Sequence, residues 1–124
     1  MSQKESVVYG LRAVIAVAKH RPQDLRRVLH VKELRKDIGI VLKATAKNRK
    51  PYREVDGDDL TRVAGTPHHE GVVAITQPLL TRAFGTAKTK LSNATCIIAA
   101  DGITNPHNMG AILRSMAWFG ADAY

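Results

Sequence analysis

The chain has 124 residues, which is enough for one compact domain and short for two. It carries 19 Lys and Arg against 11 Asp and Glu, and the net charge of +8 favours a polyanionic partner, most simply nucleic acid. No apolar stretch approaches the ~20 residues of a membrane-spanning helix. The N-terminal segment MSQKESVVYG lacks the apolar core of a secretory signal. We therefore expect a cytoplasmic protein with no membrane partner.

The first part of the chain predicts alternating helices and strands. Apolar residues repeat at helical spacing from Leu11 to His20, and the interleaved segment Leu25 to Val31 predicts a strand. Glu33 to Lys47 predicts a second amphipathic helix, and Pro51 to Val55 a short strand.

A short helix is predicted at Asp56 to Ala64, with Asp58 or Asp59 as its N-terminal cap and Gly65 at its end. A turn and the apolar strand Val72 to Ile75 follow. The alternation of helices and strands predicts a small α/β domain.

The last third of the chain is predicted to form a strand and a helix after a linker. Thr76 to Asn93 shows no clean period, as expected of a connection between two domains. Ala94 to Ala100 predicts a buried strand, in which Cys96 is interpreted as a small buried hydrophobe. A helix is predicted from Asn108 to Phe119, closed by Gly120. Its apolar stripe is expected to face a core and comprises Met109, Ile112, Leu113, Met116 and Ala117.

Arg114 lies off that stripe. Its side chain is expected to lean toward the helix N-terminus, across Gly110, where no side chain blocks it. With Asn108 as a cap and free backbone N–H groups nearby, this helix start suits an anion such as an RNA phosphate.

The segment DGITNPHNMGAILRSMAWFGA resembles the first motif of the SpoU/TrmH branch of the SPOUT RNA methyltransferases. The resemblance implies methylation of a ribose 2′-hydroxyl in tRNA or rRNA, with S-adenosylmethionine as methyl donor. It also implies that Arg114 engages the ribose-phosphate and helps to deprotonate the hydroxyl, that Asn108 shapes the site, and that the catalytic domain works as a homodimer.

Two further motifs are similar to the substrate-binding domain of the same family. YGLRAVIAVAKHRP resembles its opening, and a DxxxLxxxxGxxHHxGVVA pattern that begins at Asp56 resembles its end. The implied organisation is an RNA substrate-binding domain at 1–77, a linker at 78–93 and the start of a SPOUT domain at 94–124. The first is expected to be a small three-layer or two-layer α/β domain like those of ribosomal proteins. The second is the first strand–helix unit of a trefoil knot.

The cofactor pocket of SPOUT enzymes is formed by later motifs of the knot. The resemblance therefore implies that this chain by itself neither binds S-adenosylmethionine nor catalyses. A stand-alone RNA-binding module without chemistry is the alternative, and a reading frame that continues past Tyr124 would distinguish the two.

The stretch from Arg12 to Arg53 holds thirteen basic residues against three acidic ones, so the positive charge is concentrated there. We expect phosphate contacts around a helix end and its turn, from Lys43, Lys47, Arg49, Lys50 and Arg53. Aromatic residues are few, which favours recognition of RNA shape and backbone over a stacking platform.

His68 and His69, with His107 as a third ligand, fit no zinc spacing, and we predict no metal site. Instead, one ring of the His68–His69 pair is expected to make a hydrogen bond in the turn and the other to contact RNA.

Overall fold

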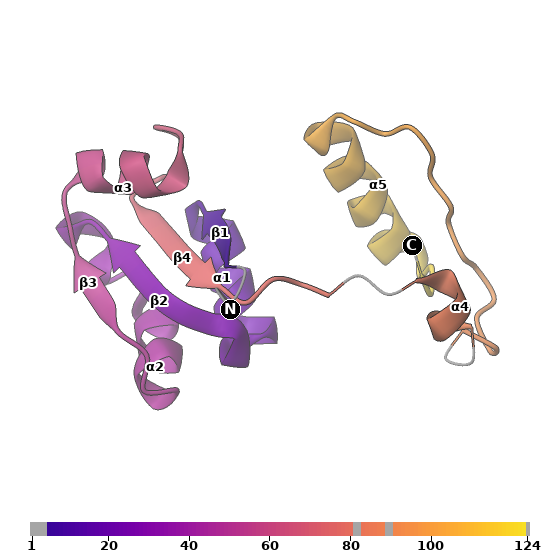
Figure 1. Cartoon of the computed structure of the whole chain (residues 1–124), viewed down its shortest axis with the longest axis horizontal. Coiled ribbons are helices and arrows are strands. Elements are labelled where there is room, and N and C mark those ends of the chain that lie inside the picture. The colour runs from indigo at the N-terminus through magenta and orange to yellow at the C-terminus, as the bar shows by residue number, and fades with distance from the viewer. Residues whose placement is uncertain (1–4, 81–82, 89–90, 124) are drawn as a thin grey trace. The chain divides into compact units, whose positions relative to one another are not determined.

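The computed structural model describes residues 5–80, 83–88 and 91–123. The chain forms two compact units that divide between Leu79 and Leu80 (Figure 1). The short helix α4 (Phe84–Ala87) lies in the segment that the sequence predicts to be a linker.

A mixed four-stranded sheet in the order β1–β4–β2–β3 organises the first unit. The central strand β4 (Val72–Thr76) pairs antiparallel with both β1 (Ser6–Tyr9) and β2 (Leu25–His30). The edge strand β3 (Tyr52–Glu54) pairs parallel with β2. Strand β4 is buried along its whole length, as expected for an apolar segment between two neighbours.

The sheet is covered on both faces, which gives three layers (Figure 1). Helices α1 (Leu11–His20) and α2 (Gly39–Lys47) form one core with Val28 of β2, whereas α3 (Gly57–Ala64) inserts Leu60 against the adjacent residue Leu29. Neighbouring residues of a strand point to opposite faces, so β2 contributes to both cores. The predicted small α/β class is confirmed, and the arrangement has three layers.

The predicted helix from Glu33 to Lys47 is wrong in its first half. A 3-10 helix, η2 (Lys32–Arg35), comes first, and α2 begins only at Gly39. Between them Ile38 is fully buried in the core with a non-helical backbone, φ −98° and ψ 18°. Burial of this side chain prevails over the continuous helical pattern because tertiary packing overrides local propensity.

Two other details of the first unit were not predicted from the sequence. The segment before Gly10 is the strand β1, which depends on pairing with the distant strand β4. The cap of α3 is Asp56, while Asp58 and Asp59 lie in its first turn, where acidic groups favour the helix dipole. Gly65 ends α3 with φ 70°, as predicted.

The second unit contains helix α5 (Pro106–Phe119), which is capped by Asn105 and not by Asn108. The Asn105 side-chain oxygen accepts a hydrogen bond from the His107 backbone N–H at 2.9 Å. Pro106 occupies the first helical position, where its missing N–H costs no hydrogen bond. Gly120 closes the helix in the left-handed conformation, as predicted.

The apolar run from Ala94 to Ala100 forms only a parallel bridge between Ile97 and Ala123, not the predicted buried strand. Cys96 is exposed, so its interpretation as a buried hydrophobe is wrong. The stripe of α5 also differs from prediction, because Met116 is buried while Leu113 remains 45% exposed. A strand and a helix face become buried only when neighbouring elements cover them, and the described part of this unit supplies few.

Asp122 holds the two sides of this bridge together. Its Oδ2 accepts hydrogen bonds from the backbone N–H groups of Cys96 at 3.0 Å and Thr95 at 2.8 Å, and from the Thr95 hydroxyl at 3.2 Å. These bonds, first of all that from Cys96, hold the pKa of Asp122 below its ordinary value of 3.8. The ionised form is favoured by folding, so its stabilising effect is present above pH 3.8 and is lost as the pH falls through the lowered pKa.

Acidification is therefore expected to loosen the bridge. The Ile98 amide, which donates to the Ala123 carbonyl at 2.9 Å, reports on it by hydrogen exchange. After correction for intrinsic rates, its protection should fall below pH 3.8 in the native chain and change much less with pH in Asp122→Asn. Equal pH dependence in both chains would remove Asp122 as the cause.

Candidate nucleic-acid interface

The C-terminal ends of α1 and α2 and the N-terminal ends of β2 and β3 lie at one end of the sheet. The Asn48 side chain after α2 donates to the Pro22 carbonyl after α1 at 2.8 Å, and the Val28 N–H donates to the Pro51 carbonyl at 3.1 Å. We call this region the basic end. Its positively charged residues are Lys19, Arg21, Arg26, Arg27, Lys47, Arg49 and Lys50, of which Arg21 is paired with Asp24 at 3.5 Å.

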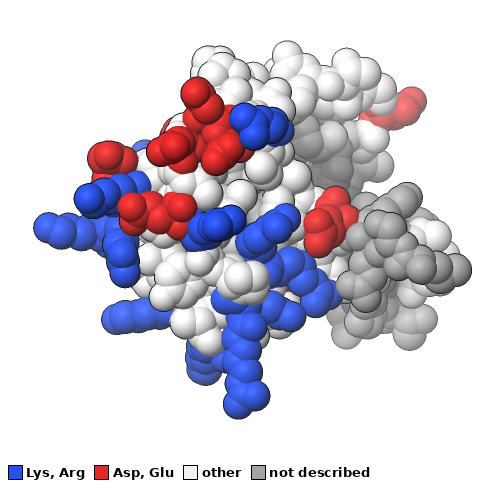
Figure 2. Space-filling model, turned by 60° about the vertical axis from the view of Figure 1, so that its left-hand side comes forward, with Lys and Arg blue, Asp and Glu red and all other residues white. Residues whose placement is uncertain are grey.

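In the view of Figure 2, Lys and Arg gather over one part of the visible surface, and Asp and Glu gather over another. Part of the positive charge serves the fold, because cations near a helix C-terminus interact favourably with its dipole. Lys19 and Lys47 occupy such last turns. Both side chains are nevertheless exposed, so they also remain free to contact phosphate.

Arg49 adopts a left-handed backbone conformation with φ 53°. Its N–H donates to the Ala46 carbonyl at 2.9 Å, and the Lys50 N–H donates to the Thr45 carbonyl at 3.0 Å. This is the Schellman pattern of a helix end, in which glycine is usual at the left-handed position. An exposed arginine here retains a charge at the cost of backbone strain, which is typical of functional positions.

Replacing Arg49 by Gly is expected to stabilise the fold and weaken RNA binding together. Glycine relieves the left-handed strain, for a gain of roughly 1 kcal/mol, while one cation is lost from the basic end. A thermal melt and an RNA titration of the same variant measure the two effects. Arg49→Ala serves as the control, since it loses the charge and keeps the strain. A Gly variant with unchanged affinity would leave Arg49 outside the interface.

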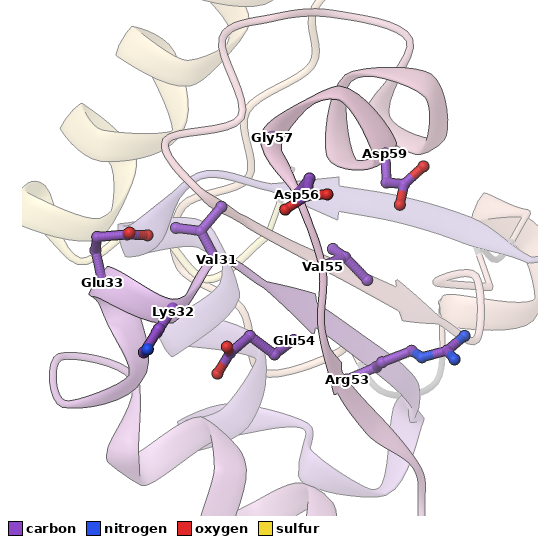
Figure 3. A pocket seen from close by; sticks show the side chains of 9 residues that line it. All are labelled: Val31, Lys32, Glu33, Arg53, Glu54, Val55, Asp56, Gly57 and Asp59. Atoms are coloured by element: carbon purple, nitrogen blue, oxygen red, sulfur yellow. The ribbon is translucent and has the colours of Figure 1, made fainter.

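The other end of the sheet is acidic. A cleft of about 650 Å³ lies there, and its charged lining residues are Lys32, Glu33, Arg53, Glu54, Asp56 and Asp59. Figure 3 shows the Arg53 side chain turned away from Glu54, as the alternation of a strand requires. Carboxylates in the majority repel phosphate, so this cleft is unsuited to an RNA backbone.

The two histidines of the turn before β4 lie at this acidic end and differ in exposure. His68 is exposed, whereas His69 is 8% exposed. The Gly71 N–H donates to His69 Nδ1 at 3.0 Å, so Nε2 carries the ring proton and donates to the Thr61 hydroxyl at 3.1 Å. Thr61 in turn donates to the Gly57 carbonyl. The expected turn hydrogen bond is therefore made by His69, which ties the turn to α3.

The same turn fixes the start of α1. Glu70 Oε2 accepts a hydrogen bond from the Leu11 N–H at 2.8 Å, which satisfies one of the free donors of that helix. Gly71 has φ 79°, and a Cβ there would approach side-chain atoms of Leu34 to 2.7 Å and of Val31 to 2.8 Å. The His-His-x-Gly motif therefore connects α1, α3 and the segment after β2, a structural role.

The five predicted phosphate-binding residues are divided by the sheet. Lys43 and Lys47 are exposed on α2, and Arg49 and Lys50 follow in the turn. Arg53 projects from the opposite face of β3. A groove of about 530 Å³ that the sequence did not predict lies there, and Arg27 and Arg62 also line it. Arg27 and Leu29 are two residues apart in β2 and therefore share a face, and this spacing is the sequence signal for a basic residue there.

In the second unit, Arg114 leans across Gly110 as predicted. A Cβ on Gly110 would lie 3.3 Å from Arg114 Nη1, so the guanidinium occupies the space that the glycine leaves. Asn108 lines a pocket of about 470 Å³ at the start of the same helix, together with Thr104 and Asn105. Neither Gly110 nor Arg114 belongs to the lining of that pocket.

Among the residues that the structure describes, no three His, Cys, Asp or Glu side chains are grouped to hold a metal ion. Within the same part of the chain, every helix is too short or too polar to span a bilayer.

The sheet, the helices on both of its faces and the basic end define a small basic α/β domain. The chain belongs to the SpoU RNA methyltransferase family, because residues 7–81 match the family described as RNA 2'-O ribose methyltransferase substrate binding. This stretch is the substrate-binding domain of that family.

Relatives resemble almost the whole chain. It is 36% identical over 120 residues to an uncharacterised tRNA/rRNA methyltransferase of Haemophilus influenzae, covering 94% of this chain and 33% of that relative. It is 34% identical to the uncharacterised tRNA/rRNA methyltransferase YfiF of Escherichia coli O157:H7, over 94% of this chain and 34% of that one. The 23S rRNA (guanosine-2'-O-)-methyltransferase RlmB of Pseudomonas putida is 31% identical to it, over 99% of this chain and 50% of that relative. The chain spans a third to a half of these relatives.

Proposed function

We propose that the complete protein transfers a methyl group to a ribose 2′-hydroxyl of tRNA or rRNA. The first unit binds the RNA, and the second unit begins the catalytic domain. The observation that carries this is the basic end, where exposed Lys47, strained Arg49 and Lys50 lie together beside two helix ends. Cations grouped at one end of the domain can position the phosphate backbone of RNA without reading its bases. Relatives of this chain are named as tRNA/rRNA and 23S rRNA methyltransferases, which supports the reaction class.

Arg114 is the group that we propose to engage the target ribose-phosphate and to favour loss of the hydroxyl proton. A guanidinium stabilises negative charge that develops on oxygen, and it does so best when held in place. Its position over Gly110 provides that placement. Asn108 is proposed to orient the nucleotide from the adjacent turn.

S-adenosylmethionine is the methyl donor that we propose for the complete enzyme. The donor needs hydrogen-bond partners for its adenine, ribose and carboxylate. The described residues of the second unit do not fit it, because its apolar cleft of about 320 Å³ is lined mainly by side chains such as Ile98, Ile112, Met116 and Phe119. The described residues of this chain therefore have no proposed role in binding the methyl donor.

We further propose that the second unit forms a homodimer in the complete protein. Trp118 is 87% exposed and Phe119 84% exposed at the end of α5. Large exposed aromatic groups favour burial against a partner. An RNA substrate makes the cytoplasm the expected compartment.

The experiment measures RNA binding and methyl transfer separately. Fluorescence anisotropy with tRNA and with 23S rRNA transcripts should show salt-dependent binding by this chain. Calorimetry should show no saturable binding of S-adenosylmethionine by it, whereas the complete protein should incorporate methyl groups into RNA. Absence of RNA binding at low salt would overturn the role of the first unit.

A stand-alone RNA-binding module without catalysis is the second candidate. The separate core of the first unit, built around Val28 and Val41, favours it because a domain with its own core can in principle fold without the rest of an enzyme. The two candidates differ in one result: only an enzyme incorporates methyl groups into bound RNA when the complete protein is assayed.

A further inference from the structure

The groove on the α3 face of the sheet combines an apolar floor with three arginines. Leu29 of β2 pairs with Arg53 of β3, and Arg27 precedes Leu29 on the same face. Helix α3 adds Arg62 and Val63 to the lining. Of these side chains Leu29 is buried and Val63 is 36% exposed, so the floor is apolar yet partly open.

The charge of the groove is positive although Asp59 also lines it beside the three arginines. Arg62 Nη1 lies 3.2 Å from Asp59 Oδ1, an exposed pair in which water weakens the attraction. Arg27 and Arg53 are exposed, and neither belongs to an ion pair among those found in the described part of the chain. The groove therefore has a net attraction for an anion.

An apolar floor beside planar guanidinium groups suits a nucleobase whose faces are exposed. Unstacked bases of single-stranded RNA stack on arginine planes and apolar surfaces, whereas bases inside a duplex cannot reach such a groove. The groove also continues the basic end, since its lining residue Pro51 directly follows Lys50. A strand whose phosphates contact the basic end can therefore pass directly into the groove.

We propose that this groove binds one unpaired nucleotide of the substrate RNA. Its base lies on the floor of Leu29 and Val63, and its phosphate contacts Arg27, while Arg53 and Arg62 flank the base. The proposal rests on the proposed RNA binding of the first unit and deepens it. The first unit then selects RNA with an exposed loop or bulge, not a continuous helix.

The test compares two labelled RNAs, a hairpin with an unpaired loop and a duplex of equal charge without unpaired bases. The native chain should prefer the hairpin. The double variant Arg53→Gln and Arg62→Gln should lower hairpin affinity about tenfold or more, given a stacked base worth ~1–3 kcal/mol, and affect the duplex much less. A 2-aminopurine placed in the loop should change its fluorescence on binding to the native chain only.

A matched control removes the same charge elsewhere. Lys32→Gln with Lys36→Gln neutralises two exposed cations at the other end of the sheet and should leave the hairpin preference intact. Equal losses for hairpin and duplex in the groove variant, or an unchanged preference, would overturn the groove proposal alone. Failure of the native chain to bind either RNA would instead overturn the proposed function.

Discussion

Replacing Arg114 by Ala in the complete enzyme is expected to lower methyl transfer by a hundredfold or more. A placed donor that stabilises developing charge typically contributes on that order. The melting temperature should hardly change, because Arg114 is exposed and surface truncations usually shift stability by only about half a kcal/mol. Arg114→Lys should also fail, since an ammonium lacks the planar fork that grips two oxygens.

Gly110→Ala supplies a positional control that leaves the arginine in place. The new Cβ would lie 3.3 Å from Arg114 Nη1, so the guanidinium must shift by a few tenths of an ångström. The exchange favours the helix by roughly 1 kcal/mol, so this variant should be more stable and less active. Methyl incorporation at saturating donor, measured beside a thermal melt, tests both variants. Near-normal turnover in Arg114→Ala would make Arg114 an ordinary solvated side chain.

The second large effect is expected at the basic end. Replacing Lys47, Arg49 and Lys50 together by Ala should weaken binding to any structured RNA. Each lost phosphate contact reduces the dependence of log K on log salt by roughly 0.7–0.9. The slope should therefore become shallower by about 2 to 3 units. Anisotropy titrations at several salt concentrations measure it.

The matched control for this triple variant lies at the other end of the sheet. Lys32, Arg35 and Lys36 are exposed and carry the same total charge. Their replacement by Ala also breaks the 3.9 Å ion pair of Arg35 with Glu54, whose exposed partners contribute little stability. If this control flattened the salt slope as much as the first variant, the effect would reflect net charge alone and not the basic end.

The His-His-x-Gly motif, which is part of the resemblance to the family, makes contacts that stabilise the fold. His69 is buried and hydrogen-bonded through both ring nitrogens, Glu70 caps α1, and Gly71 leaves room for Leu34. We therefore keep His69 out of the proposed interface. His68 is exposed but lies beside the acidic cleft, away from the basic end, so its predicted contact with RNA stays a prediction.

Local sequence was sufficient to predict elements whose bounds depend only on their own residues. Helix α1 was predicted with its observed bounds, because its apolar spacing ends at the charged turn before Pro22. Gly65 and Gly120 end their helices in the left-handed conformation that glycine adopts most readily. The lean of Arg114 over Gly110 also follows from helix geometry alone. The family resemblance rested on ordered motifs and is confirmed for residues 7–81.

The tertiary structure decided what depends on contacts between distant segments. Burial of Ile38 broke the predicted helix, and pairing with β4 made a strand of Ser6–Tyr9. Cys96 is exposed because few of the described residues of the second unit cover it, which an apolar run does not reveal. Strand alternation placed Arg53 on the face of Arg27, where α3 adds Arg62, and apart from Lys47. Such groupings are set by sheet register and packing, so composition and spacing predicted the basic charge but not the face on which each arginine lies.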